Sequence, residues 1–424
     1  MPPSVSPAAG SPPLPRGFHA LLGAQFCSAL ADNALLIVTI ALLQRRGLPL
    51  WWAPLLKVGF TLSYVLLAPL VGPLADAVPK ARLMAWMNGL KIVGLAGMLL
   101  GWHPVLAYSL VGLGAAAYAP AKYGLVTELV PARALVAANG WLEVSIVGAA
   151  LLGTVLGGLL VAPWLGLPSL GAQGLDCSLA ALAGLYALAA LLQLAVPDSG
   201  ARYPAAPLLR PLALTRDFWR SHRRLWRDAE GGLSLAVTTL FWGVGATLQL
   251  AVLRWAELRL GLPLERAAWL QAAVAIGVVV GAALAGRCVP LAAAWRVLPL
   301  GLLLGLLIIA IAWVQDLALA LPLLALTGAV GGLLVVPMNA LLQHRGYQLL
   351  SAGRSIAVQG FNENLSVLLM LGAYAGALAL ELPLLPLMSG FGALIALAMA
   401  ALLWRRGRAA PSSSRRLGRD VGAG

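Results

Sequence analysis

The stretch Ala24–Leu36, AQFCSALADNALL, places a carboxylate inside an apolar run. The run extends from Ala20 to Leu43 and is long enough to cross a bilayer as a helix. Asp32 lies near its middle, where a charge costs about 2.5–3.5 kcal/mol unless helices or a water-filled cavity shield it from lipid. Other helices must therefore surround this one. Asp32 is either a structural residue paired with Asn33 or a lysine, or a polar group on a transport path; we favour the second interpretation.

The composition is that of an integral membrane protein. The 424 residues are 61% hydrophobic and 10% charged, with a mean hydropathy of +0.89, whereas soluble domains carry about 25% charged residues. Residues 1–15 lack the charged start of a cleavable signal peptide, so we expect the first helix to be retained. The net charge of +14 fits basic loops beside anionic lipid better than nucleic acid. The spacing of Cys27, Cys177 and Cys288 matches neither a disulfide framework nor a zinc site, and we expect no metal and no cofactor.

Apolar runs of about twenty residues predict an all-α fold with twelve transmembrane helices. The predicted spans are residues 19–43, 54–75, 83–102, 104–122, 134–163, 176–196, 231–254, 267–286, 296–314, 317–342, 354–379 and 382–404. The longest polar connection separates six spans from six. We therefore expect an N-terminal tail (1–18), a first six-helix half (19–196), a linker (197–230), a second half (231–404) and a basic, disordered tail (405–424).

The charges of the loops predict the orientation. If both termini are cytoplasmic, 22 lysines and arginines fall on the inner side and 5 on the outer side, with Lys57 and Lys91 inside spans. Because positive loops stay in the cytoplasm, this bias predicts a multi-pass protein of the cell inner membrane with both ends inside.

The two halves resemble each other weakly. GWLE at 140–143 corresponds to GFNE at 360–363, and PAKYG at 120–124 corresponds to PMNAL at 337–341. Two six-helix repeats joined by a linker are typical of an alternating-access transporter whose site lies between the repeats.

The linker contains a predicted amphipathic helix. Between Leu214 and Trp226, apolar and aromatic residues recur every three or four positions, and the other face carries five arginines, at positions 216, 220, 223, 224 and 227. The pattern favours a helix lying on an anionic membrane surface over a plain solvated linker helix.

The segment 72–82, GPLADAVPKAR, resembles the loop signature of the major facilitator superfamily. We interpret it as a conformational latch in which the glycine permits close helix approach and the aspartate accepts from a helix N-terminus or pairs with a base. Ala77 and Pro79 depart from the family pattern, and residues 281–287 form a degenerate copy. The predicted latch residues are Gly72, Asp76, Lys80 and Arg82.

Several further polar residues lie within or beside the predicted spans. Lys91 sits near mid-span and needs a partner, for which Asp32 or Glu143 is available. Amides in such positions more often pack helices together, for about 0.6 kcal/mol each. The predicted substrate or coupling residues are Asp32, Asn33, Lys91, Lys122, Tyr123, Asn139, Glu143, Gln249, Gln359 and Glu363.

Four motifs carry a more specific resemblance: FCSALADNALL (26–36), GAAAYAPAKYG (114–124), VVPMNALLQ (335–343), and AVQ (357–359) with EN (363–364). They resemble the bacterial lysophospholipid transporters of the major facilitator superfamily, and the similarity runs from about residue 19 to residue 404. Gln249 replaces a basic residue of some relatives, which leaves open how a head-group phosphate is held. The matching family positions are Asp32, Asn33, Lys122, Tyr123, Asn139, Glu143, Gln359 and Glu363.

The resemblance implies a flippase that moves lysophosphatidylethanolamine and lysophosphatidylglycerol from the outer to the inner leaflet. A cytoplasmic acyl carrier protein-dependent acyltransferase would then restore the missing chain. From the charge distribution we expect the head group on the first half and the acyl tail against the second half or toward lipid. The alternative of the same fold is an exporter of drugs or amphipathic metabolites. An intramembrane enzyme is disfavoured because all four histidines lie at span ends or in loops.

Overall fold

The computed structural model describes residues 14–49, 52–162, 172–204 and 210–409. The expected tails fall largely outside these residues. The first-half helices are α1 (Arg16–Arg45), α2 (Trp52–Leu66), α3 (Ala68–Ala77), α4 (Lys80–Leu99), α5 (Pro104–Leu129), α6 (Leu135–Val161) and α7 (Ala172–Leu194). Helix α8 (Pro211–Arg227) lies in the linker. The second half contains α9 (Ala229–Leu260), α10 (Leu264–Cys288), α11 (Leu298–Trp313), α12 (Leu317–Leu349), α13 (Ala352–Ala379) and α14 (Leu384–Ala409).

Twelve spans account for these helices apart from α8, with α2 and α3 forming one span. Within the described residues, nine helices are long and apolar enough to cross a membrane, and the bent pair α2–α3 makes a tenth. The remaining two, α4 and α13, carry charged and amide side chains that lower their hydropathy. The predicted all-α fold is confirmed.

The second predicted span is broken, which the sequence analysis missed. Helices α2 and α3 meet at Leu67 with a bend of 64°. Pro69 follows at the start of α3, where it cannot donate a backbone hydrogen bond and disfavours helical geometry at Ala68. The bend directs α3 toward α13 of the second half, and these two helices are in contact.

The predicted end of the fourth span is also corrected. The predicted span ended at Lys122, and this lysine was included among the positive charges of the inner loops. In the structure, α5 continues to Leu129. Lys122 is buried inside the protein. A lysine can lie within a spanning helix here because neighbouring helices, rather than lipid, surround it.

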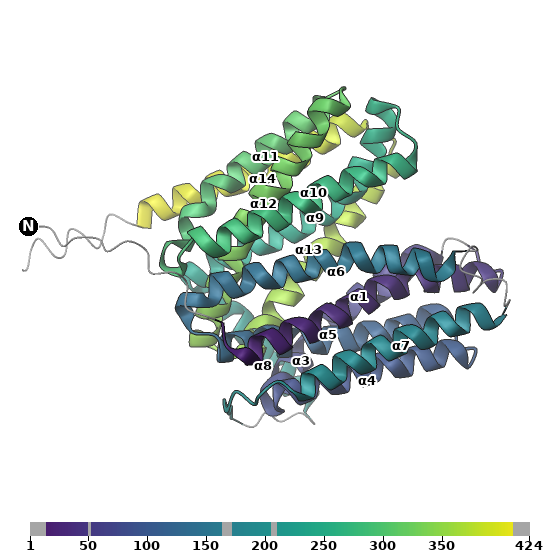
Figure 1. The fold of residues 1–424 in the computed structure, drawn as a ribbon. Coiled ribbons are helices and arrows are strands. Elements are labelled where there is room, and N and C mark those ends of the chain that lie inside the picture. The colour runs from purple at the N-terminus through teal and green to yellow at the C-terminus, as the bar shows by residue number, and fades with distance from the viewer. Residues whose placement is uncertain (1–13, 50–51, 163–171, 205–209, 410–424) are drawn as a thin grey trace, which may run out of the picture.

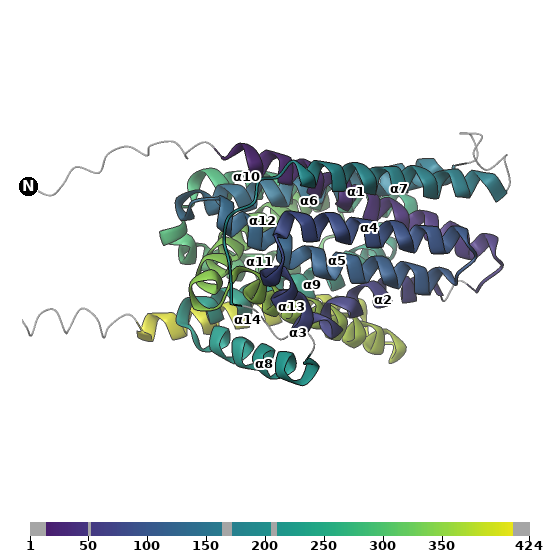
Figure 2. The same ribbon diagram turned by 90° about the horizontal axis from the view of Figure 1, so that it is seen from below.

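The two halves converge on one side of the molecule and diverge on the other (Figure 1). Helix α1 begins and α14 ends on the converging side, which we call the terminal side (Figures 1 and 2). A hydrophobic cluster joins the halves, since it contains Phe18 and Leu125 of the first half with Ala282 and Val336 of the second. The arrangement leaves the space between the halves widest away from the termini.

Small residues let helices of opposite halves approach closely at the terminal side. A Cβ added to Gly140 of α6 would lie 2.8 Å from the carbonyl oxygen of Ala282 in α10. One added to Gly286 would lie 3.2 Å from the Cα of Ala137. Backbone contact of this kind is favourable in membranes, where close van der Waals packing replaces the hydrophobic effect.

Helix α8 packs against α3, α9 and α13 along the side of the bundle (Figure 2). Its buried side chains are Leu214, Phe218, Ser221 and Leu225. The protein's own helices therefore cover part of the predicted apolar face. Trp219, Trp226 and all five predicted arginines remain exposed, so placement on an anionic membrane surface stays a prediction.

Candidate functional site: a cavity between the two halves

A cavity of about 800 Å³ lies between the halves. Its size falls within the range of about 300–1,000 Å³ that is typical of ligand pockets. Nine of the ten predicted substrate or coupling residues line it: Asp32, Asn33, Lys91, Lys122, Tyr123, Glu143, Gln249, Gln359 and Glu363. Asn139 does not line it. The sequence analysis thus selected residues that helices from both halves bring together.

Asp32 and Lys91 form an ion pair on the first-half wall. The Nζ of Lys91 lies 2.8 Å from each carboxylate oxygen of Asp32. The Lys91 side chain is 1% exposed, whereas that of Asp32 is 20% exposed at the cavity surface. Of the two candidate partners of Lys91, Asp32 and Glu143, the structure pairs it with Asp32. The pair joins α1 to α4 and leaves part of the Asp32 side chain exposed to the cavity.

A buried polar network supports this pair. Tyr186 of α7 donates to Asp32 at 2.6 Å, and Ser28 accepts from Lys91 at 3.0 Å. Ser28 donates in turn to Asn88, whose amide donates to Gln193. The network joins α1, α4 and α7 and holds the ion pair in one geometry, because each buried group has a partner.

A second polar group lies deeper, toward the terminal side. Lys122 donates to Gln25 at 3.4 Å and lies 4.2 Å from the ring centroid of Tyr123. Glu143 interacts electrostatically with Lys122 without a direct ion pair. This part of the cavity therefore offers charges of both signs, which suits a zwitterionic group.

The second-half wall is mainly apolar. Leucine, isoleucine, valine and phenylalanine side chains of α9, α10, α11 and α12 line it, among them Phe241, Val278 and Ile308. Its polar strip lies on α13, where Gln359 donates to Glu363 at 2.8 Å and to Asn339 of α12 at 3.0 Å. Gln249 also lines the cavity, and its backbone carbonyl oxygen accepts a hydrogen bond from the side-chain amide of Gln271.

Asn139 joins the two halves instead of lining the cavity. Its amide donates to Gln343 of α12 at 2.9 Å, and Gln343 donates back at 2.8 Å. Both side chains are buried at the terminal side. This reciprocal pair connects the two halves at the terminal side, so Asn139 belongs to the contact between the halves rather than to the cavity wall.

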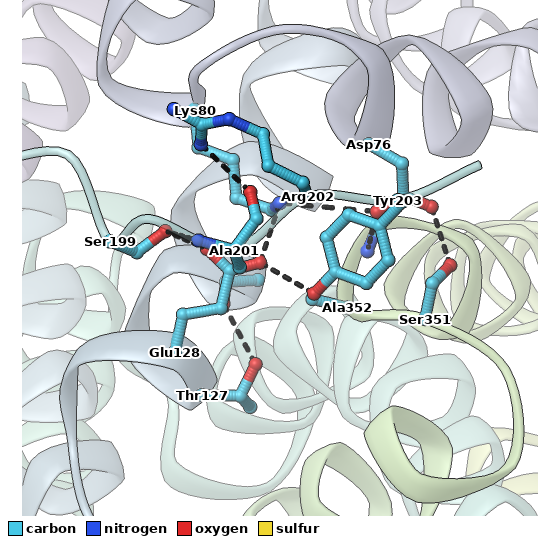
Figure 3. Close-up of polar contacts among 12 residues, drawn as sticks. Asp76, Lys80, Thr127, Glu128, Ser199, Ala201, Arg202, Tyr203, Ser351 and Ala352 are labelled. Carbon is cyan, nitrogen blue, oxygen red and sulfur yellow. Dashed lines mark hydrogen bonds and ion pairs between the residues drawn. The ribbon is translucent and has the colours of Figure 1, made fainter. Parts of the chain in front are cut away.

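The predicted latch also joins the halves (Figure 3). Asp76 accepts from the hydroxyl of Ser351 and from the backbone N–H of Gly353, at the N-terminus of α13. Gly72 permits this contact, because a Cβ there would lie 2.9 Å from that of Ala357. The expected acceptance from a helix N-terminus therefore occurs, and it connects α3 to α13.

Lys80 extends the latch to the start of the linker (Figure 3). Its Nζ lies 2.6 Å from Glu128 and 3.9 Å from Asp76. Glu128 also accepts from Ser199 and, at 2.7 Å, from Tyr203. Arg82 is exposed and interacts electrostatically with Asp198 rather than with Asp76. Gly72, Asp76 and Lys80 thus lie in this contact between the halves and Arg82 does not; its action as a conformational latch stays a prediction.

Sequence reasoning missed the uncharged members of these clusters. Ser28 and Gln25 precede Asp32 on the same helix by about one and two turns, respectively, a spacing that would have revealed them. Tyr186 and Gln193 interrupt the apolar run of α7. Glu128 and Ser351 were not identified because their partners come from other helices.

Comparisons with known proteins agree with this architecture. The family model described as Major Facilitator Superfamily matches residues 21–370. The chain is 43% identical over 393 residues to the lysophospholipid transporter LplT of Escherichia coli O7:K1, covering 92% of this chain and 96% of that protein. LplT of Escherichia coli strain K12 has the same identity and coverage.

Solved structures share the fold at low sequence identity. A bacterial homologue of the iron transporter ferroportin, in an outward-facing state, superposes with a TM-score of 0.70 at 15% identity, covering 92% of this chain and 99% of that one. The transporter FucP in its outward conformation gives 0.67 at 16% identity, with coverages of 92% and 98%. The chain belongs to the Major Facilitator Superfamily and, within it, to the family of the lysophospholipid transporter LplT.

Proposed function

We propose that this protein is a lysophospholipid flippase of the bacterial inner membrane. It moves lipids such as lysophosphatidylethanolamine and lysophosphatidylglycerol from the outer to the inner leaflet by alternating access. The observation that carries the proposal is the unequal chemistry of the two cavity walls. Charges line the first half, and the second half is mainly apolar. A lysolipid, with one charged head and one long tail, matches this division.

The two polar groups have distinct roles in this proposal. The deeper group, with Lys122 and Glu143, receives the phosphate and the amine of the head group. The exposed part of Asp32 provides an earlier contact for the amine, while Lys91 holds that carboxylate in place. The acyl tail lies against α9–α12, whose apolar side chains replace the lipid chains that surround it in the membrane.

The described conformation is, in this proposal, the outward-facing state. The loop charges predict that the terminal side is cytoplasmic, and the cavity lies on the diverging side of the seam between the halves. Inward opening requires breaking the Asn139–Gln343 pair and the contacts of Asp76 with α13. Each hydrogen bond contributes about 0.5–1.5 kcal/mol, and one to a charged group about 1.5–3 kcal/mol. The sum is small enough for a reversible transition between states.

The product would be a lysolipid in the inner leaflet, chemically ready for reacylation. We propose an acyl carrier protein-dependent acyltransferase in the cytoplasm as the functional partner. The transporter itself performs no chemical step in this scheme.

Uptake of labelled lysophosphatidylethanolamine by spheroplasts tests the proposal. Spheroplasts containing the protein should accumulate the lipid in the inner leaflet faster than spheroplasts lacking it. Equal uptake in both, with the protein verified in the membrane, would contradict the assignment. Export of fluorescent amphipathic drugs without lysolipid uptake would favour the exporter instead.

A further inference from the structure

Three lysines line the cavity, and one of them differs from the other two. Lys91 is paired with Asp32, and Lys122 contacts Gln25 and Tyr123. Lys57 is exposed in the cavity and, within the described part of the chain, has no hydrogen-bond or ion-pair partner. Its charge is therefore available to a ligand.

Lys57 also lies nearest the diverging side. It is five residues from the start of α2 on that side, which corresponds to about 8 Å along the helix. Asp32 lies thirteen residues before the end of α1, or about 20 Å deep by the same measure. Lys122 lies eighteen residues into α5, or about 27 Å deep. The three positions form a series from the mouth of the cavity inward.

The wall around Lys57 is aromatic rather than acidic. Phe60, Thr61 and Tyr64 follow on the same face of α2 and line the cavity. The ring centroid of Phe60 lies 6.0 Å from that of Tyr64 and 5.6 Å from that of Tyr108. Among the described residues that line the cavity, Lys57 is the one positive charge at the mouth, where it lies beside an aromatic surface, whereas the deeper group carries both signs.

We propose that Lys57 is the capture site for the phosphate of the substrate at the mouth of the cavity. This inference rests on the proposed function and names a residue that acts before the inner polar groups. A lone cation recognises the phosphodiester that all lysophospholipids share, so Lys57 promotes entry without selecting among head groups. Discrimination between head groups then belongs to the deeper residues, where a carboxylate meets an amine.

The test compares Lys57→Gln and Lys57→Arg with the parent in proteoliposome uptake of labelled lysophosphatidylethanolamine and lysophosphatidylglycerol. Loss of one charge-assisted contact should raise KM about tenfold for both lipids. Uptake at saturating lipid should stay within about twofold of the parent, because the inner groups are intact. Lys57→Arg should retain a KM close to that of the parent.

Two controls isolate the effect of the charge. Arg133→Gln removes an exposed positive charge outside the cavity and should leave KM unchanged. Raising salt should reduce parent uptake more than that of Lys57→Gln, since salt screens an exposed charge. Inorganic phosphate should not compete in a Lys57-dependent manner; if it does, the site binds free phosphate and the proposal of lipid capture is wrong.

The outcomes separate this inference from the proposed function. An unchanged KM in Lys57→Gln, with normal melting and active parent protein, would overturn the capture site and leave the flippase assignment intact. Effects on lysophosphatidylethanolamine alone would overturn a shared phosphate contact. A parent protein that transports neither lipid would contradict the proposed function itself.

Discussion

At the scale of residues, the Asp32–Lys91 pair combines a structural and a functional position. The sequence favoured a functional Asp32 over a structural one. The structure pairs its carboxylate with a lysine that is 1% exposed and also brings it to the cavity surface. The two interpretations are therefore compatible, and a double substitution separates their contributions.

Asp32→Asn should lower thermal stability, because it leaves the Lys91 ammonium buried without its counter-charge. Removing one partner of a buried pair costs about 3–5 kcal/mol. Adding Lys91→Met should restore the melting temperature without restoring lysolipid uptake, since the carboxylate at the cavity surface is still missing. The measurements are melting of the detergent-solubilised protein and uptake by proteoliposomes. Parent-like uptake by the double variant would assign the pair a purely structural role.

The residues that could be predicted were those that carry charge inside an apolar run. Asp32, Lys91 and Glu143 were identified because lipid does not tolerate an unshielded charge. Their exact partners depend on how helices pack. Tyr186 lies 154 positions from its partner Asp32, and Gln193 lies 105 positions from its partner Asn88. Side-chain spacing within one helix does not contain that information.

At the scale of elements, the bend between α2 and α3 positions the latch. It places Gly72 and Asp76 against the N-terminus of α13. The latch motif could be recognised from sequence, but the bend and the identity of its partner helix could not. Pro69 marked the break, yet the surrounding run is apolar enough to be interpreted as one continuous span.

Gly72→Ala and Asp76→Asn should both slow uptake while leaving lysolipid affinity near that of the parent. The new methyl group would lie 3.0 Å from the Cα of Arg354, so α3 and α13 must separate. Asp76→Asn weakens a charge-assisted contact of about 1.5–3 kcal/mol with Gly353. Gly89→Ala is a matched control, because its Cβ would meet no atom within 4 Å. Equal losses of affinity and rate would instead indicate a direct substrate contact or a disrupted fold.

The start of α9 anchors the linker through Asp228, which accepts from Arg345 at 2.6 Å. Burial raises the pKa of Asp228, but hydrogen bonds from Arg345 and the N–H of Gly231 outweigh it, so the pKa lies below its ordinary value. The contact therefore stabilises the anchor above about pH 3.9, the pKa of an unfolded aspartate, and is lost as pH falls through the lower folded value.

Limited proteolysis of the linker at different pH values checks this anchor. Asp228→Asn should make the linker susceptible to cleavage at neutral pH, while the parent should become susceptible only on acidification below about pH 4. Arg202→Gln is a suitable control, because its ion pair with Asp198 is exposed. Equal cleavage of Asp228→Asn and the parent at neutral pH would contradict a stabilising role for this contact.

At the scale of the whole molecule, twelve spans in two groups could be predicted from hydropathy and loop charge. The relation between the halves could not, because it depends on contacts between residues that lie far apart in the sequence. The closed terminal side depends on contacts such as Asn139–Gln343, whose members lie 204 positions apart. The sequence analysis assigned Asn139 to the substrate site, and the structure assigns it to the seam between the halves.

Reversible cross-linking of that seam tests alternating access and lysolipid transport together. Asn139→Cys and Gln343→Cys would be introduced after replacing Cys27, Cys177 and Cys288, and joined with a short, reducible bifunctional thiol reagent. We predict that the cross-linked protein binds lysophosphatidylethanolamine from the outer side but does not take it up, and that reduction restores uptake. Undiminished uptake by fully cross-linked protein would contradict the account.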